Sequence, residues 1–139
     1  MNLPQRPPAG PRAVVGTAAE SAAAAHLVRA GWTVLGRNVR IGRDEVDILA
    51  REPGPAGALV VVEVRARSRP GFGEAAESVD RHKVSRLYRA AWALRRAGHP
   101  AIVRAGGPGT VWRVDLITLV RSPAGAWRIE RHVRGLEPP

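Results

Sequence analysis

Hydrophobic positions along the chain predict two helices. Residues Ala13 to Ala30 are a run of strong helix formers, and Gly31 stands where a helix C-terminal cap is expected. A second segment, residues 79–97, has apolar side chains at helical spacing and begins at either of two N-cap candidates, Ser78 or Asp80. The apolar positions of this second segment are Val84, Leu87, Tyr88, Ala91 and Leu94.

Period-two alternation predicts five strands. The strongest segment is Ala58 to Ala66, ALVVVEVRA, which follows a turn rich in glycine and proline at residues 51–57. We expect residues 40–50 and 58–66 to pair as an antiparallel hairpin. The other predicted strands are Trp32 to Leu35, Asn38 to Ala50, Val111 to Val120 and Trp127 to Val133. In the last of these, Trp127, Ile129, Arg131 and Val133 are expected on one face.

The predicted order of elements is α-β-β-β-α-β-β. This order favours an α/β fold, or α+β sandwich, in which helices pack on a mixed sheet. The chain of 139 residues is long enough for one domain, which we place at residues 13–133. The proline-rich residues 1–12 and the final residues 134–139 are expected to be tails without structure.

Composition excludes several classes of protein. The chain has no cysteine, which excludes thiolate nucleophiles and cysteine-based zinc sites. Its four histidines show no zinc-binding spacing. The longest stretch free of charged residues is Pro53 to Val62, ten residues and far short of a membrane span. Residues 1–12 lack an apolar signal-peptide core, so we expect a cytoplasmic protein.

The charge balance indicates a polyanionic partner. The formal net charge is +10 and the pI is about 11.7, and basic surfaces concentrate phosphates and release counterions on binding. Nucleic acid is therefore the expected partner. An arginine-biased proteome is the alternative, because Lys83 is the single lysine among 22 basic residues.

Alternation also places candidate chemistry on the sheet. Glu63 and Arg65 point to the same face of their strand, and a plausible hairpin register brings Asp47 near Glu63. Two converging carboxylates suit Mg²⁺ or Mn²⁺, which would activate a phosphodiester for hydrolysis. The alternative is a solvated surface on which these residues form cross-strand ion pairs.

Four sequence blocks together carry a family resemblance. They are Gly16-x-x-x-Glu20, the segment ending in Asp47, VVVEVRAR at 60–67 and WRVDLI at 112–117. In order and spacing they resemble the uncharacterised YraN-like (UPF0102) family, which is similar to the Holliday-junction-resolvase branch of the PD-(D/E)xK nucleases. The resemblance implies a restriction-endonuclease-like fold. It also implies that Glu20, Asp47 and Glu63 are metal ligands, joined by the backbone carbonyl of Val64.

The chain departs from the nuclease pattern at two positions. Val46 replaces a loosely kept proline, and Arg65 occupies the place of the superfamily lysine. Arginine cannot lose its proton, so Arg65 holds phosphate or stabilises charge but is no general base. Lys83, near the start of the second helix, is our candidate for the missing amine, and a solvated surface lysine is the alternative. Glu20 likewise has an alternative role, complementing its helix dipole.

The resulting hypothesis is a Mg²⁺- or Mn²⁺-dependent endonuclease acting on structured DNA or another nucleic acid. Its proposed phosphate-binding residues are Arg65, Arg67, Arg69, Arg81 and Arg86, with Arg89 beside them. Asp115 is expected to be structural or an outer partner of an arginine, and the four tryptophans are expected in the core rather than stacked on bases. Two rivals are a non-catalytic nucleic-acid-binding module and an interaction protein. A homodimer is expected by analogy with resolvases.

Overall fold

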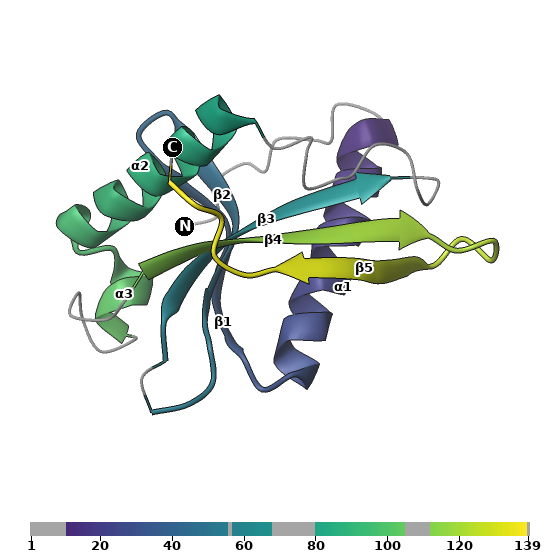
Figure 1. Cartoon of the computed structure of the whole chain (residues 1–139), viewed down its shortest axis with the longest axis horizontal. Helices are drawn as coiled ribbons and strands as arrows, with labels where there is room; N and C mark the ends of the chain where they lie inside the picture. The colour runs from purple at the N-terminus through teal and green to yellow at the C-terminus, as the bar shows by residue number, and fades with distance from the viewer. Residues whose placement is uncertain (1–10, 56, 68–79, 105–111, 139) are drawn as a thin grey trace, which may run out of the picture.

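The computed structural model describes residues 11–55, 57–67, 80–104 and 112–138, with side chains from Thr17 onward. The described residues form three helices and five strands (Figure 1). The helices are α1 (Pro11–Arg29), α2 (Arg81–Ala97) and α3 (Pro100–Arg104). The strands are β1 (Thr33–Ile41), β2 (Asp44–Arg51), β3 (Leu59–Arg67), β4 (Trp112–Arg121) and β5 (Trp127–Val133).

The five strands form one mixed sheet in the order β1-β2-β3-β4-β5. β1, β2 and β3 pair antiparallel, as expected for the predicted hairpin, whereas β3 and β4 are parallel and β4 and β5 antiparallel. A parallel pair needs a crossover connection, and α2 lies on the one between β3 and β4. The predicted mixed α/β architecture is therefore confirmed, with α3 as an addition.

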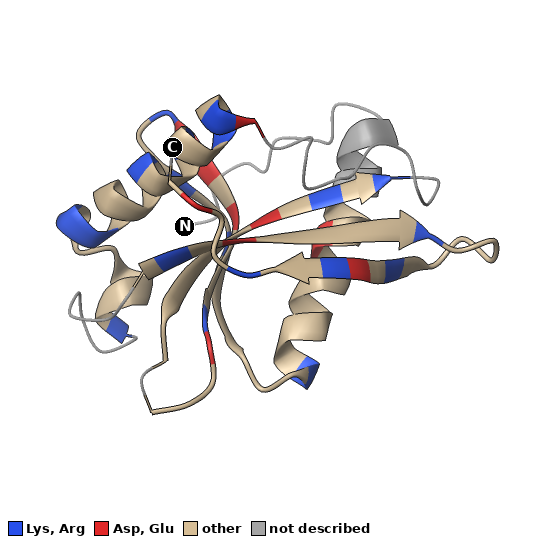
Figure 2. Cartoon of the chain, viewed as in Figure 1, with Lys and Arg blue, Asp and Glu red and all other residues tan. Residues whose placement is uncertain are grey.

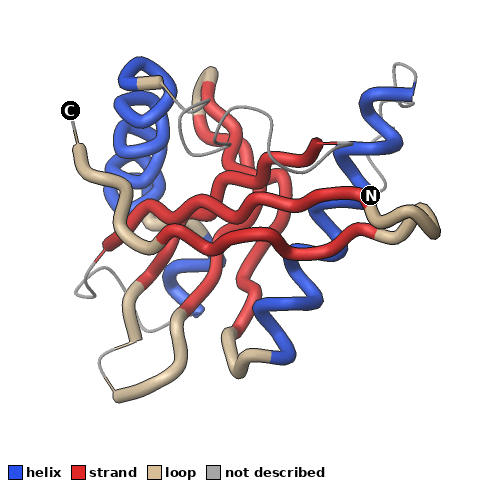
Figure 3. Tube along the Cα trace, turned by 45° about the vertical axis from the view of Figure 1, so that its right-hand side comes forward, coloured by secondary structure: helices blue, strands red, loops and turns tan. Residues whose placement is uncertain are grey.

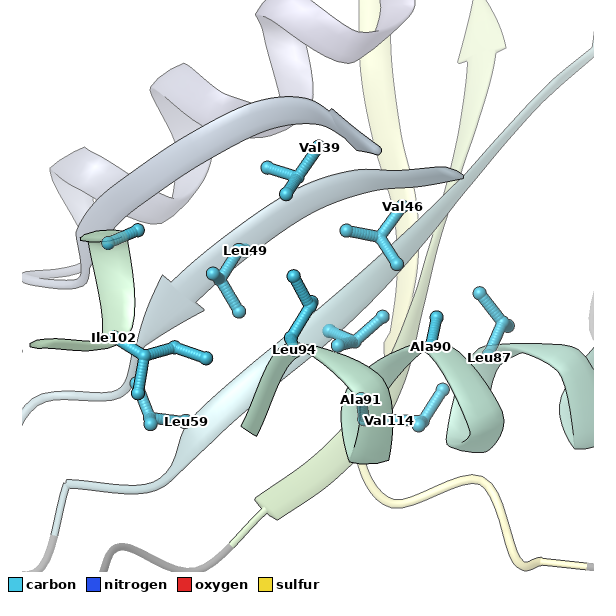
Figure 4. Close-up of a cluster of buried hydrophobic side chains, with 12 residues drawn as sticks. Val39, Val46, Leu49, Leu59, Leu87, Ala90, Ala91, Leu94, Ile102 and Val114 are labelled. Atoms are coloured by element: carbon cyan, nitrogen blue, oxygen red, sulfur yellow. The ribbon is translucent and has the colours of Figure 1, made fainter. Parts of the chain in front are cut away.

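Helices cover both faces of the sheet, with α1 on one side and α2 with α3 on the other (Figures 1 and 3). On the α1 face, Ala19, Ala23 and Leu27 pack against buried residues of β2, β3 and β4. On the α2 face, Leu87 and Leu94 pack against the alternate residues of the same strands (Figure 4). Because β3 contributes to both cores, its residues 59–62 are all buried, which explains the unbroken apolar run in the sequence.

Two boundaries differ from the sequence prediction. The turn between the first two strands lies at residues 42–43, where Ile41 pairs with Asp44 and Gly42 has a φ of 58°. The prediction placed the break near Gly36, which instead sits inside β1 at a shift in register. The helix α3 was missed because five residues are too short to show a helical period.

The last strand shows a further correction. The pairing of β4 with β5 shifts by one residue, so that Thr118 faces Arg131 but Leu119 faces Ile129. This bulge inverts the alternation beyond residue 130. Trp127 and Ile129 both pack on the α1 face, whereas Val133 packs against Leu116 on the α2 face. The predicted shared face for all four residues is therefore wrong.

The chain ends also differ from expectation. α1 begins at Pro11, inside the predicted N-terminal tail. Residues 134–138 contain no helix or strand, but the Leu136 N–H donates to the Val114 carbonyl at 2.7 Å and the Tyr88 hydroxyl donates to the Leu136 carbonyl. The C-terminal segment is therefore attached to β4 and α2.

Trp92 is a correction of another kind. Its side chain lies on the outside of α2 and is 60% exposed, so the expectation of core packing is wrong for this residue, although Trp32 is buried.

Within the described residues, no helix combines the length and apolar character that a membrane crossing requires.

Candidate functional site: a buried carboxylate pair

The sheet positions Asp47 and Glu63 side by side. The β2–β3 ladder runs from Arg51 opposite Leu59 to Ile48 opposite Val62, and the next residues along each strand are Asp47 and Glu63. Beyond this point the backbone ladder is replaced by a side-chain contact, because Asp47 Oδ2 accepts a hydrogen bond from the Val64 backbone N–H at 2.8 Å. The hairpin register expected from the sequence therefore does bring the two carboxylates together.

Glu63 lies between two cations from different elements. Its side chain is only 6% exposed, and its Oε1 is 3.4 Å from Arg65 Nε and 3.6 Å from Lys83 Nζ. Arg65 comes from the same strand, whereas Lys83 reaches across from the first turn of α2. Asp80 caps that helix by accepting the Lys83 backbone N–H at 2.8 Å. The structure thus brings the lone lysine to the carboxylate pair.

One oxygen of this cluster has no hydrogen-bond partner among the described residues. Glu63 Oε2 is buried and neither Arg65 nor Lys83 satisfies it; a hydrogen bond between the Glu63 and Asp47 carboxyl groups forms when one of them carries a proton. An unpaired buried carboxylate oxygen is costly. It is therefore a feature that a cation or a proton would satisfy.

Burial dominates the electrostatics of the pair. The pKa of Glu63 is raised to about 7: loss of solvent is the largest cause, the neighbouring charge of Asp47 acts in the same direction, and Lys83 and Arg65 oppose both. Burial also raises the pKa of Asp47, although the Val64 N–H and Lys83 favour its charged form. Two buried carboxyl groups in contact resist simultaneous ionisation, so the pair favours a bound positive charge.

Glu20 lies at the margin of this cluster. It is half-buried on α1, and burial first, then the charge of Asp47, raises its pKa. The Asn38 amide nitrogen lies 3.1 Å from Glu20 Oε2 and 3.3 Å from Glu45 Oε1 when the amide is oriented to satisfy both. Glu45 and Asn38 were not singled out from the sequence. Asn38 adopts a positive φ of 49°, a conformation that asparagine tolerates well, but its letter in the sequence gives no hint of this.

Across the part of the chain that the structure describes, no three acidic or histidine side chains gather as a metal-ligand group. The predicted trio is therefore a close pair, Asp47 and Glu63, with Glu20 near enough for the charge of Asp47 to raise its pKa. Two protein carboxylates are an ordinary ligand set for Mg²⁺, which keeps several waters.

The predicted phosphate-binding arginines do not form one cluster. Arg65 lies in the site, and Arg67 Nε is 4.0 Å from Glu130 Oε2 on β5. Arg81 and Arg86 are exposed on α2, and Arg69 lies outside the described residues. Figure 2 shows basic residues along α2, toward the end of β3, at the end of β4 and along β5, where an acidic residue lies between two basic ones. Arg89 binds both Asp44 oxygens, at 3.0 and 2.8 Å, so it joins α2 to the start of β2.

Asp115 belongs to a separate network, as its structural interpretation predicted. It is fully buried on β4 and accepts two hydrogen bonds from Arg113, at 2.7 and 2.9 Å. His132 Nε2 lies 2.8 Å from Asp115 Oδ2, and the Gly135 N–H donates to Oδ1 at 2.9 Å. These contacts fasten β5 and the C-terminal segment to β4.

Comparison with known proteins identifies the family. Residues 19–119 match the model of the uncharacterised protein family UPF0102. The chain belongs to this family. The UPF0102 match includes Glu20, Asp47, Glu63, Arg65 and Lys83. The family assignment made from the sequence is therefore confirmed.

UPF0102 relatives occur in several bacteria. A UPF0102 protein of Deinococcus radiodurans is 44% identical over 86 residues, which are 61% of this chain and 68% of that protein. One from Acidothermus cellulolyticus is 37% identical over 130 residues, covering 91% of this chain and 96% of the relative. Among solved structures, Pyrococcus furiosus SfsA in complex with Ca²⁺ is similar at a TM-score of 0.38 and 15% identity, over 89% of this chain and 64% of that chain.

Proposed function

We propose that this UPF0102 protein is a metal-dependent nuclease that hydrolyses phosphodiesters in structured DNA. The observation that carries the proposal is the buried Asp47–Glu63 pair with Lys83 3.6 Å from Glu63. Perturbed carboxylates beside a single amine are typical of sites that perform chemistry. The net charge of +10 favours a polyanionic substrate.

The residues present fit a divalent cation of the Mg²⁺ or Mn²⁺ type. Asp47 and Glu63 would hold it, because both are oxygen donors and Glu63 Oε2 has no protein partner within the described structure. A bound ion of this type polarises a phosphoryl oxygen and favours attack by water. Glu20, whose pKa is raised by burial and by the charge of Asp47, would contribute a third carboxylate near this ion.

The two cations would have different tasks. The guanidinium group of Arg65 would orient the scissile phosphate and stabilise the negative charge that develops on it. The Lys83 ammonium has three N–H donors, and it would assist the departure of the leaving oxygen by donating to it. Asp80 positions Lys83 by capping α2.

The test is cleavage of duplex, single-stranded, flapped and four-way-junction DNA in Mg²⁺ and in Mn²⁺. We expect the wild type to cut at least one substrate, and Asp47→Ala and Glu63→Ala to abolish cutting. Glu137→Ala is the matched control, because Glu137 is an exposed acid outside the site. Cleavage that persists in Asp47→Ala would overturn the assignment.

Arg65 favours a second candidate function, a non-catalytic nucleic-acid-binding module on the same fold. A module of this kind has no catalytic activity, so neither a metal ion nor Asp47 would be needed for its function. Binding would survive Asp47→Ala, or strengthen as a negative charge is removed. Absence of cleavage by the wild type, with intact salt-dependent binding, would select this second function.

A further inference from the structure

Two rows of side chains cross the sheet next to Glu63. In the parallel β3–β4 ladder Arg65 lies beside Thr118, and in the β4–β5 ladder Thr118 lies beside Arg131. One step further along the strands, Arg67 lies beside Val120, which lies beside Arg128. Each row therefore has an arginine of β3 at one end and an arginine of β5 at the other.

Both rows lie on the α2 face of the sheet, the face of the carboxylate pair. Glu63 of the preceding row contacts Lys83 of α2, and Leu116 and Val133 of that same row pack with Val84 of α2. Residues two apart on a strand share a face. The bulge in β5 keeps Arg131 on this side, and without it the alternation from Ile129 would place Arg131 on the α1 face.

The rows are close to the proposed site. Adjacent rows are separated by about 7 Å along a strand, and β3 and β5 by about 10 Å across the sheet. Arg128 and Arg131 are exposed, whereas the side chains of Arg65 and Arg67 are 38% and 17% exposed. Figure 2 shows basic residues toward the end of β3 and along β5, where an acidic residue lies between two basic ones. Two acids lie against these arginines: Glu63 Oε1 is 3.4 Å from Arg65 Nε, and Glu130 Oε2 is 4.0 Å from Arg67 Nε.

A second observation points to a ligand at the same place. Thr118, between Arg65 and Arg131, is 1% exposed, and its Oγ1 has no hydrogen-bond partner among the described residues. A buried hydroxyl flanked by guanidinium groups is a combination that suits an oxyanion, because the hydroxyl donates while the arginines supply charge.

We propose that Arg128 and Arg131 of β5 bind backbone phosphates of the nucleic acid, together with Arg65 and Arg67, along the side of the Glu63 site formed by β5. This inference rests on the proposed function and adds to it a path for the strand that carries the scissile phosphate. Phosphate contacts of this kind set register and orientation without reading sequence.

Binding of a fluorescently labelled DNA duplex to the full chain in EDTA tests this inference, because no cleavage occurs without metal. Each lost phosphate contact makes the slope of log K against log salt shallower by about 0.9, so Arg128→Gln/Arg131→Gln is expected to reduce it by about 1.8. The matched control is Arg29→Gln/Arg121→Gln. It removes the same charge from the end of α1 and from the α1 face of β4, where Arg121 stacks on Trp127.

A charge-preserving pair, Arg128→Lys/Arg131→Lys, guards against loss of fold. It is expected to keep the wild-type slope. Arg131→Gln alone is expected to reduce the slope by about half as much as the double glutamine variant. Equal slopes for the glutamine pair and its control would overturn the inference, as would wild-type protein that binds no DNA at low salt. Cleavage of DNA by the wild type together with equal slopes would leave the nuclease proposal standing. Reduced slope without any cleavage would refute the nuclease and support the phosphate path.

Discussion

Replacing Glu63 by glutamine should make the metal-free protein more stable at neutral pH. Glu63 is a buried acid whose pKa rises from 4.5 to about 7 in the folded chain, chiefly because burial disfavours its charge. The folded state therefore holds a proton that the unfolded state releases at lower pH. Stability is unaffected below pH 4.5 and falls as the pH rises from there to about 7.

The size of this loss follows from the shift. Each pKa unit corresponds to 1.36 kcal/mol, so ionising Glu63 costs about 3 kcal/mol once the pH is above both pKa values. Solvent screening changes this little because the side chain is 6% exposed. Relative to pH 4.5, we expect Glu63→Gln to gain about 3 kcal/mol over the wild type at about pH 8, or about 10 °C in melting temperature for a chain of this length.

Urea unfolding across this pH range, in EDTA, measures the difference. Glu137→Gln is the control, because it removes an exposed acid and should show no such pH-dependent gain. A Glu63→Gln gain that does not grow between pH 4.5 and about pH 8 would refute the reasoning, because it would show that Glu63 ionises without cost in the folded chain.

Three other outcomes are expected. Mg²⁺ or Mn²⁺ should stabilise the wild type by about 2.7 kcal/mol at one hundred times its dissociation constant, and Glu63→Gln by much less; equal stabilisation in a thermal shift assay would place the ion elsewhere. Lys83→Met should raise the pKa of Glu63 further, because Lys83 lowers it. Lys83→Arg should return the Glu63 pKa to its wild-type value without restoring cleavage. An unchanged Glu63 titration in Lys83→Met, followed by carbon NMR, would contradict the contact. Asp115→Ala should cost about 1.5 to 3 kcal/mol in urea unfolding, because Arg113 and His132 lose their contacts with a buried carboxylate while Arg113 keeps its ion pair with Glu52. A loss below about 1 kcal/mol would show that the network adds little.

Local pattern was sufficient for most of the fold. The helix α2, the strand β3 and the pairing of β2 with β3 follow from apolar spacing and turn residues alone, whereas the choice of Asp80 over Ser78 as the helix cap came from the structure. Such features depend on neighbours within a few residues, so the sequence encodes them directly. Because these signals involve only a few neighbouring residues, they did not fix the strand boundary near Gly36 or reveal the short helix α3.

Half of the candidate site was within reach of the sequence. Asp47 and Glu63 had to be neighbours once their strands formed a hairpin, because a register fixes cross-strand partners. That both are buried, with raised pKa values, depends on the helices packed over the sheet. The sequence did not predict that Glu45 and Asn38 lie near Glu20, because their approach depends on how α1 packs on β1 and β2.

The sequence by itself determined the order of elements, the strand that carries Glu63 and Arg65, and the hairpin that brings Asp47 to them. Only the tertiary structure decided that Lys83 meets Glu63, because the position of a helix on a sheet is set by side-chain packing between segments far apart in the chain. It also decided the facing of Arg131, since a bulge depends on how β5 fits its neighbour and leaves no periodic trace in the sequence.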